Sequence, residues 1–376
     1  MYDLSKLDEY VKSLGHVGIP FCGLEVRQHH KVIYRGFENF TEEEKARGTN
    51  ENSIVWLFSA TKVITCIAGM RLVEEGKIGL DDPVSKYLPE YGKMKVNTKD
   101  GLRDAETVML VRHLFSMSSG LNYSLSSPSL VQAKENGMKT TRELVCAIAD
   151  EPLEFDPGTS YRYSLSHDVL AAVIEVASGM TFGEYLKKFI FDPLGIKSMG
   201  FAPDAEIKSR FAGQYSYDNG SYTCSFRETV NGFILSDKYE SGGAGLYSNL
   251  LDYIKITDAI ACGGTAENGY RILRPETIAL MEVNQNTVAG LRVFHGSPCR
   301  HGYGWGLCGQ VHMDPEISQS HSPVGQFGWD GAAASYALID RKNELAIFFL
   351  THIFSCGYAY ERVHPTIRNL VYDAIK

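Results

Sequence analysis

The sequence predicts an α/β (α+β) fold in which both ends of the chain supply strands to one antiparallel sheet. Two β-rich runs, 20–26 and 32–37, lie near the start, and two more, 335–339 and 345–351, lie near the end. The long segment between them is mostly helical and loop-rich. Strands at both ends with helices between favour a sheet flanked by helices, with a helical domain inserted into it. We therefore expect residues 1–82 and 239–376 to form the sheet domain and 83–238 to form the inserted domain.

The elements follow in order along the first part of the chain. Apolar residues recur at helical spacing over 4–14 and predict a short amphipathic helix. The two N-terminal runs are joined by the polar segment 27–31, which predicts a hairpin with a rather long turn. The segment 59–75 contains good helix formers and is followed by Gly76, a residue that commonly ends helices. Asp81-Asp82-Pro83 predicts the start of another helix.

The remaining elements complete this outline. Helices are predicted at 169–178, closed by Gly179, and at 181–191. The two C-terminal runs flank the turn-like segment 340–343 and predict a second hairpin. The chain from Leu370 onward is typical of the end of a closing helix.

Composition excludes several classes of protein. The 45 acidic and 37 basic residues give a net charge of −8, which argues against a nucleic-acid partner. Eight cysteines in 376 residues, with no C-x-x-C pair, argue against a disulfide scaffold and a zinc or thioredoxin-like site. The first residues are charged, and no window approaches the roughly 18 apolar residues of a membrane span. We expect a cytoplasmic protein with no membrane partner.

The sharpest chemical feature is Ser59-Ala60-Thr61-Lys62, in which a lysine follows a serine by three positions at the start of a helix. This spacing places the ammonium one turn after the hydroxyl on the same helix face. A lysine there can accept the proton of the hydroxyl or stabilise the resulting alkoxide, and the helix N-terminus favours negative charge. The alternative is a capping serine followed by a surface lysine. The apolar run 63–68 that follows favours a buried lysine.

Further segments in the same order carry a family resemblance. These are 71–84, Val111 to Leu121, Tyr163-Ser164-Leu165, Gly242 to Ser248 and Gly328 to Gly331. Together with Ser59-x-x-Lys62 they resemble the serine β-lactamase and penicillin-binding protein superfamily, in its class C β-lactamase-like branch. The resemblance covers nearly the whole chain. It implies a β-lactamase/DD-peptidase-like fold with the active site in the cleft between the two domains.

Two departures from the family pattern point toward its esterases. Leu165 stands where the family usually has the asparagine of Tyr-x-Asn, and Trp329-Asp330-Gly331 stands in place of Lys-Thr-Gly. Apolar or aromatic groups therefore replace two residues with which β-lactamases bind their substrates. Among relatives, the chain is most similar to the family VIII carboxylesterases.

The resemblance implies roles for particular residues. Ser59 is the expected nucleophile, and Lys62 and Tyr163 share its proton. Since a phenol has an ordinary pKa of about 10, a nearby ammonium is needed to hold Tyr163 partly ionised. Two other tyrosines, Tyr217 and Tyr247, precede an asparagine at the family's spacing, but their surroundings fit less well. The expected oxyanion hole consists of the backbone N–H groups of Ser59 and Ala332.

Other residues are expected to contact substrate or only to pack. Gly331, Leu165, Trp329 and Tyr123 are the candidate substrate-binding residues, with a core position as the alternative for Trp329. His167 and Asp168 follow Tyr163 closely, and we expect them to face the surface of their helix or to cap it. No H-E-x-x-H sequence or phosphate-binding loop occurs, so no metal and no cofactor is expected.

The function expected from the sequence is a serine hydrolase that cleaves small esters through an acyl-serine. Its expected partner is a small acyl substrate, and the sequence gives no indication of oligomeric state. One alternative is a β-lactamase or a peptidase specific for D-amino acids. Another is a non-catalytic protein that binds an acyl ligand or a peptidoglycan fragment, against which the joint presence of Ser59, Lys62 and Tyr163 argues.

Overall fold

The computed structural model describes residues 2–376, and a seven-stranded antiparallel sheet built from both ends of the chain lies at its centre. The strand order is β2-β1-β13-β12-β11-β10-β9. N-terminal β1 pairs with C-terminal β13, with Val26 opposite Ile347. The strands of this sheet are β1 (Phe21–Gln28), β2 (Lys31–Asn39), β9 (Tyr303–Gly306), β10 (Gly309–His312), β11 (Phe327–Asp330), β12 (Tyr336–Asp340) and β13 (Leu345–Leu350). The expected antiparallel sheet with flanking helices is thus confirmed.

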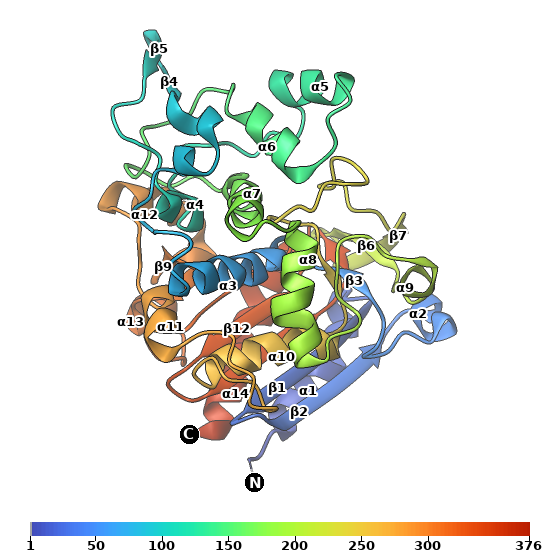
Figure 1. The fold of residues 1–376 in the computed structure, drawn as a ribbon. Helices are drawn as coiled ribbons and strands as arrows, with labels where there is room; N and C mark the ends of the chain where they lie inside the picture. Colours follow the sequence, from blue (N-terminus) through green and yellow to red (C-terminus); the bar gives the residue numbers. More distant parts are fainter. Residues whose placement is uncertain (1) are drawn as a thin grey trace.

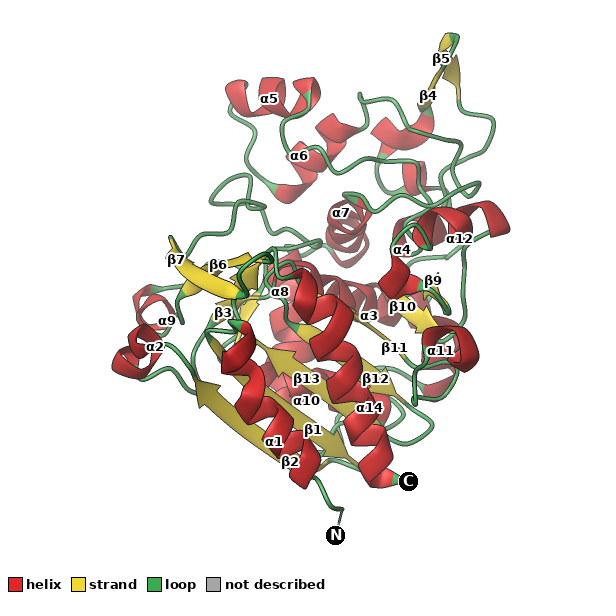
Figure 2. Cartoon of the chain, turned by 180° about the vertical axis from the view of Figure 1, so that it is seen from behind, coloured by secondary structure: helices red, strands yellow, loops and turns green. Residues whose placement is uncertain are grey.

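Helices cover both faces of the sheet. In Figure 2, α1 and α14 lie side by side in front of the sheet, and α10 lies on its far face. In Figure 1, α3 and α8 also lie on the α10 side, α4 lies beside α7, and α5 and α6 lie farther from the sheet, beyond α7. The helices are α1 (Ser5–Ser13), α2 (Glu42–Arg47), α3 (Thr61–Glu74), α4 (Val111–Phe115), α5 (Pro128–Glu135), α6 (Thr141–Ile148), α7 (Ser166–Ser178), α8 (Phe182–Leu186), α9 (Ala205–Ser209), α10 (Leu250–Ala261), α11 (Pro275–Met281), α12 (Val288–Phe294), α13 (Pro315–Ser318) and α14 (His364–Ile375).

The N-terminal hairpin has a tighter turn than the sequence predicts. Strands β1 and β2 extend through most of the polar segment, and only His29 and His30 form the turn, with φ of 49° and 63°. Left-handed backbone at both positions is what a two-residue hairpin turn of type I′ requires, and such a turn is usually recognised by an Asn-Gly pair. Two histidines give no such signal. The His30 Nδ1 atom lies 2.8 Å from Asp258 Oδ2, so the turn is also held by α10.

The middle of the chain contains more strand than expected. Two hairpins occur there, and the second of them pairs in parallel with a C-terminal strand. The helix expected from Pro83 is only a single 3-10 turn, Val84–Lys86. The smaller strands are β3 (Val55–Trp56), β4 (Lys95–Thr98), β5 (Gly101–Asp104), β6 (Gln214–Asp218), β7 (Thr223–Arg227), β8 (Tyr247–Ser248) and β14 (Ile353–Phe354). The division into residues 1–82 with 239–376 and an inserted 83–238 stays a prediction.

Helices α3 and α7 form the buried centre on which the site is built. They pack against each other, and the whole first half of each is buried. Helix α7 ends at Gly179, whose φ of 71° is the left-handed conformation predicted for it. Within residues 2–376 no single helix is both long enough and apolar enough to cross a membrane. One bent pair, Ser166–Ser178 with Phe182–Leu194, meets that test by length and composition.

Candidate active site

Ser59 lies in a strained turn between strand β3 and helix α3. The turn spans Phe58–Ala60, and Phe58 has a φ of 48°, a conformation that costs energy for a residue with a side chain. Packing maintains it, because the buried Phe58 ring lies 4.7 Å from the Phe354 ring, centroid to centroid. Ser59 is half-buried although both of its neighbours are fully buried. The turn therefore exposes one hydroxyl at the end of a rigid element.

Lys62 is buried directly beneath this hydroxyl. Only 1% of its surface is exposed, and its Nζ atom lies 3.4 Å from Ser59 Oγ. The ammonium donates to the carbonyl of Gly243 at 2.7 Å and to the hydroxyl of Tyr123 at 3.3 Å. It also lies 4.6 Å from the centre of the Tyr163 ring. The alternative of a solvated surface lysine is therefore excluded.

A buried carboxylate accompanies this buried cation. Burial alone would lower the pKa of Lys62, but Tyr123, Tyr163 and Asp168 outweigh burial and raise the pKa above its ordinary value. Burial also raises the pKa of Asp168, and the Lys62 charge opposes that rise. Asp168 Oδ1 accepts hydrogen bonds from Ser241 at 2.6 Å and Tyr239 at 2.9 Å. At neutral pH Lys62 is therefore an ammonium.

The positions of His167 and Asp168 differ from expectation. Both are at most 1% exposed, so neither faces the helix surface. The His167 Nε2 atom lies 3.1 Å from the carbonyl of Phe115. Burial, with a further contribution from Lys62, lowers the pKa of His167 to about 3, so the ring is neutral. The sequence signal for Asp168 was its place within an otherwise apolar helix, where a charge is retained only if it is paired.

Tyr163 is held among aromatic rings. Its hydroxyl accepts a hydrogen bond from Trp329 Nε1 at 3.0 Å. Its ring stacks on Tyr123 with 5.5 Å between centroids and an interplanar angle of 7°. Trp305 is fully buried and packs edge to face on Trp329, with 4.4 Å between ring centroids. The hydroxyl of Tyr163 is thus fixed at the same cavity wall as Ser59.

Gly331 allows the end of strand β11 to approach the Ser59 turn. A Cβ atom there would lie 2.3 Å from the carbonyl oxygen of Leu57 and 2.4 Å from Ser335 Oγ, distances that no side chain can occupy. The next residue, Ala332, lines the same cavity as Ser59. Within residues 2–376, neither the Ser59 N–H nor the Ala332 N–H donates to an acceptor of the protein. Two residues that line the cavity therefore each have an unused backbone donor.

The cavity above Ser59 has a volume of about 370 Å³ and unites residues from distant parts of the chain. Its lining residues are Ser59, Tyr161, Tyr163, Val293, Phe294, Ser297, Arg300, Trp329, Asp330 and Ala332. Of the expected substrate-binding residues, Trp329 lines it. Tyr123 and Gly331 are not among the lining residues. Tyr123 accepts a hydrogen bond from Lys62, and Gly331 allows the end of strand β11 to approach the Ser59 turn. Leu165 is only 2% exposed at the start of α7 and does not line the cavity.

The cavity also contains charged residues that the sequence analysis missed. Arg300 and Asp330 lie in its wall with their charged atoms 2.8 Å apart. Arg300 comes from an irregular segment with no periodic pattern, so nothing in the sequence connected it with Ser59.

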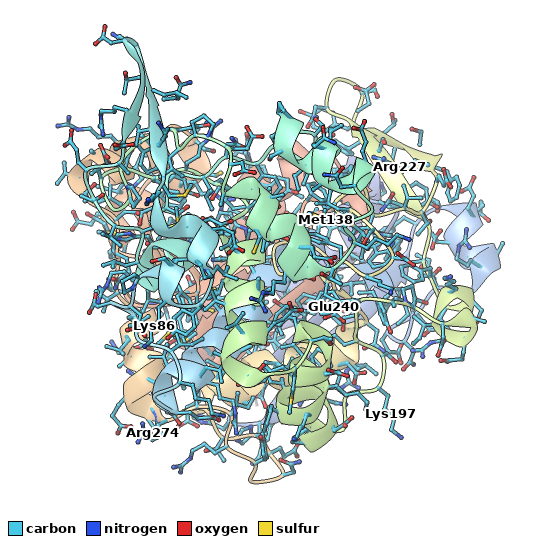
Figure 3. All side chains as sticks on the ribbon, turned by 45° about the horizontal axis from the view of Figure 1, so that its top comes forward. Lys86, Met138, Lys197, Arg227, Glu240 and Arg274 are labelled. Atoms are coloured by element: carbon cyan, nitrogen blue, oxygen red, sulfur yellow. The ribbon has the colours of Figure 1, made fainter. Side chains whose placement is uncertain are left out.

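Two other features lie away from this cavity. A larger cavity of about 1010 Å³ is lined in part by Glu175, Met180, Phe201 and Glu240. Figure 3 shows Glu240 on the face turned toward the viewer, below Met138. Among residues 2–376, His30, Asp258 and Cys262 could hold a metal ion, since their ligand atoms lie within 4.8 Å of one another. The Arg27 guanidinium, 4.0 Å from Asp258, already supplies positive charge there.

The fold and the buried Ser59–Lys62 pair together define a serine hydrolase. A family model described as Beta-lactamase matches residues 7–361, and the chain belongs to this family. This confirms the resemblance seen in the sequence.

Individual relatives agree with this assignment. The chain is 28% identical over 374 residues to Esterase EstB of Burkholderia gladioli, covering 93% of this chain and 89% of that protein. Two solved structures share the fold. EstCE1, described as a hydrolase with promiscuous acyltransferase activity, has a TM-score of 0.78 at 24% identity, covering 98% of this chain and 97% of that one. Simvastatin synthase (LovD) of Aspergillus terreus has a TM-score of 0.82 at 21% identity, and the match covers 99% of this chain and 98% of that one.

Proposed function

We propose that this protein is a carboxylesterase that cleaves small esters through an acyl-serine at Ser59. The observation that carries the proposal is the buried Lys62 ammonium, 3.4 Å from Ser59 Oγ and beneath the Tyr163 ring. The 28% identity to an esterase over most of both chains supports the same reaction class.

The charges of the site indicate how the proton moves. Because Lys62 is an ammonium, it stabilises a developing alkoxide electrostatically and is a poor base. Tyr163, acting as a phenolate beside that ammonium, is then the group that accepts the Ser59 proton and becomes a neutral phenol. The Ser59 oxygen forms a bond to the ester carbonyl carbon, and the ester C–O bond breaks. Tyr163 returns the proton to the leaving alcohol.

The two free N–H groups are suited to the carbonyl oxygen of the substrate. As the carbonyl becomes an oxyanion, the Ser59 and Ala332 N–H groups donate to it, and removal of one such donor typically costs about 10²–10³ in rate. Water then attacks the acyl-serine and Tyr163 accepts a proton from it. The bond between the acyl carbon and Ser59 Oγ breaks, Tyr163 returns the proton to Ser59 Oγ, and the free acid leaves.

We also propose a cytoplasmic location and a small acyl compound as the partner. All eight cysteines are free thiols, which is typical of a reducing compartment. The net charge of −8 disfavours nucleic acid as a partner.

The test compares three forms of the enzyme on p-nitrophenyl esters of graded chain length and on nitrocefin. Wild type turns over the short esters and forms a Ser59 adduct visible by intact mass, and Ser59→Ala loses both. Ser297→Ala is the matched control, since this serine lines the same cavity, and it retains turnover. A protein without adduct or turnover would be a binding protein. Nitrocefin turnover far above ester turnover would instead identify a β-lactamase.

A further inference from the structure

Arg300 and Asp330 are the charged residues that line the Ser59 cavity. Their side chains are 16% and 12% exposed, and Arg300 Nη2 donates to Asp330 Oδ2 at 2.8 Å. The two groups thus form a mostly buried ion pair in the wall of the cavity that holds the nucleophile. In such a location solvent screens charge much less than at an open surface.

Several contacts fix the guanidinium in this position. Its central carbon lies 4.3 Å from the centre of the Trp329 ring, and Nη1 donates to Gln310 Oε1 at 2.6 Å. Burial would lower the pKa of Arg300, but Asp330 outweighs burial and raises it, so the group is always charged. The cation cannot swing into solvent without losing a stacking contact and two hydrogen bonds.

The consequence concerns the charge that a substrate meets. Deeper in the site, Asp168 accompanies the Lys62 ammonium, and at the wall Asp330 accompanies Arg300. The Arg300–Asp330 pair therefore has no net charge, and the charged residues that line the cavity offer a ligand neither an unpaired cation nor an unpaired anion. A cavity wall with Arg300 alone would attract anionic substrates, and one with Asp330 alone would attract cationic substrates.

We propose that Asp330, by cancelling the charge of Arg300, sets the substrate preference of the Ser59 site to esters whose acyl and alcohol parts are uncharged. This inference rests on the proposed esterase function and adds the substrate class. Asp330 and Arg300 act as specificity-determining residues because they alter which ester binds and leave the chemistry to Ser59.

The test measures kcat/KM for three esters that differ only in the end group of the acyl chain. They are the p-nitrophenyl esters of hexanoate, of adipate (the monoester, an anion) and of 6-(trimethylammonio)hexanoate (a cation). A second series, acetate esters of alcohols with the same three end groups, covers the alcohol side. The variants are Asp330→Asn, Arg300→Met and the double variant Asp330→Asn/Arg300→Met, with thermal unfolding measured for each.

The expected results form a charge cycle. Wild type prefers the uncharged ester. Asp330→Asn raises the ratio of anionic to uncharged kcat/KM by about 10-fold, as expected for one unpaired charge in a partly desolvated site. Arg300→Met lowers that ratio and raises the ratio of cationic to uncharged kcat/KM by a similar factor. The double variant returns both ratios to near the wild-type values.

Two further variants separate charge from shape and from misfolding. Arg300→Lys keeps the charge but loses the planar stack on Trp329, and its ratios are expected to stay near wild type. Asp330→Ser provides a second uncharged replacement if Asp330→Asn does not fold. Ratios that stay the same in every folded variant would overturn the inference. A wild type without activity on any ester would overturn the proposed function itself.

Discussion

The hydroxyl of Tyr163 is positioned by its aromatic neighbours, because Tyr163 itself lies in the irregular segment before helix α7. Tyr123 stacks on its ring, Trp329 donates to its oxygen at 3.0 Å, and Trp305 packs against both Tyr163 and Trp329. A donor aimed at the oxygen leaves the phenol proton free to point elsewhere and stabilises negative charge when that proton leaves. In the proposed reaction Trp329 is therefore a positioning residue for the base, in addition to lining the cavity.

Trp329→Phe tests this role at the scale of one hydrogen bond. Phenylalanine keeps an aromatic ring for Arg300 and Trp305 but has no N–H for Tyr163. Because hydrogen bonds to charged groups contribute about 1.5–3 kcal/mol, we expect kcat to fall by about 10- to 100-fold with KM changed far less. Steady-state kinetics on a short p-nitrophenyl ester measures this.

The control for this variant is Tyr161→Phe, which changes another hydroxyl of the same cavity wall and is expected to keep most of kcat. If Trp329→Phe raised KM and left kcat intact, Trp329 would act in substrate binding alone.

At the scale of elements, the site depends on the distance between the end of strand β11 and the turn before helix α3. Gly331 contacts the backbone of Leu57, and its carbonyl accepts a hydrogen bond from Tyr360 at 2.8 Å. This contact brings Ala332 to the cavity that Ser59 also lines. Small residues at this point are therefore explained by close backbone approach as well as by substrate access.

Gly331→Ala is expected to separate the two elements. The new Cβ atom would meet the Leu57 carbonyl oxygen at 2.3 Å, and backbone must move to relieve it. We expect kcat/KM to fall by about 10²–10³, the usual effect of losing one oxyanion donor, together with a lower thermal unfolding temperature. Gly232→Ala is the matched control, since a Cβ there has nothing within 4 Å. Full activity in Gly331→Ala would show that Ala332 is not part of an oxyanion hole.

The junction between helices α7 and α8 contains a carboxyl group that makes stability depend on pH. Glu175 Oε1 accepts from the Phe182 N–H at 3.1 Å, and burial raises the pKa of Glu175 from 4.5 to about 7. Because the folded state binds this proton more tightly than the unfolded state does, its contribution is fully present below pH 4.5 and is lost as pH rises through about 7.

Glu175→Gln removes this titration but keeps an oxygen for the Phe182 N–H. We expect the variant to be more stable than wild type by about 2–3 kcal/mol at pH 8, since one pKa unit corresponds to 1.36 kcal/mol, and nearly equal to it at pH 4.5. Urea unfolding at both pH values measures the difference. Glu9→Gln, exposed on helix α1, is the control and should show no such pH dependence. An equal effect of Glu175→Gln at both pH values would contradict the assignment.

For the whole molecule, the parts of the fold predictable from sequence are those with strong local patterns. Strands β12 and β13 are runs of apolar and β-branched residues, and they form the second hairpin as predicted. Strands β9 and β10 are rich in glycine, which has little strand preference, and together with the short strand β11 they are the three strands of this sheet that the pattern did not predict. Strands β6 and β7 alternate weakly and were likewise missed.

The residues of the site were predictable where they belong to motifs that follow one another along the chain in the order typical of the family. Ser59, Lys62, Tyr163 and Trp329 all gather at one place although 270 positions separate Ser59 from Trp329. Arg300 reaches the cavity only through tertiary packing, and no local rule connects it with Asp330. Asp168 follows Tyr163 by five positions, but the burial of its helix face depends on α3, which local spacing cannot reveal.

Hydrogen exchange is expected to rank the parts of the molecule by their place in the sheet. Strands β12 and β13 lie near the middle of the seven-stranded sheet and are fully buried along their length, so their amides open only with the whole fold. The β4–β5 hairpin projects from the opposite end of the molecule and is largely exposed. Mass spectrometry should therefore find the slowest exchange in peptides covering 336–350 and fast exchange in those covering 95–104.

Helix α10 covers one face of the central strands, and α1 with α14 covers the other. Ile367→Ala in α14 should therefore speed exchange in 336–350 and leave exchange in 95–104 unchanged. Equal exchange in the two regions of the wild type would show that the sheet joining the two ends of the chain is not the stable core.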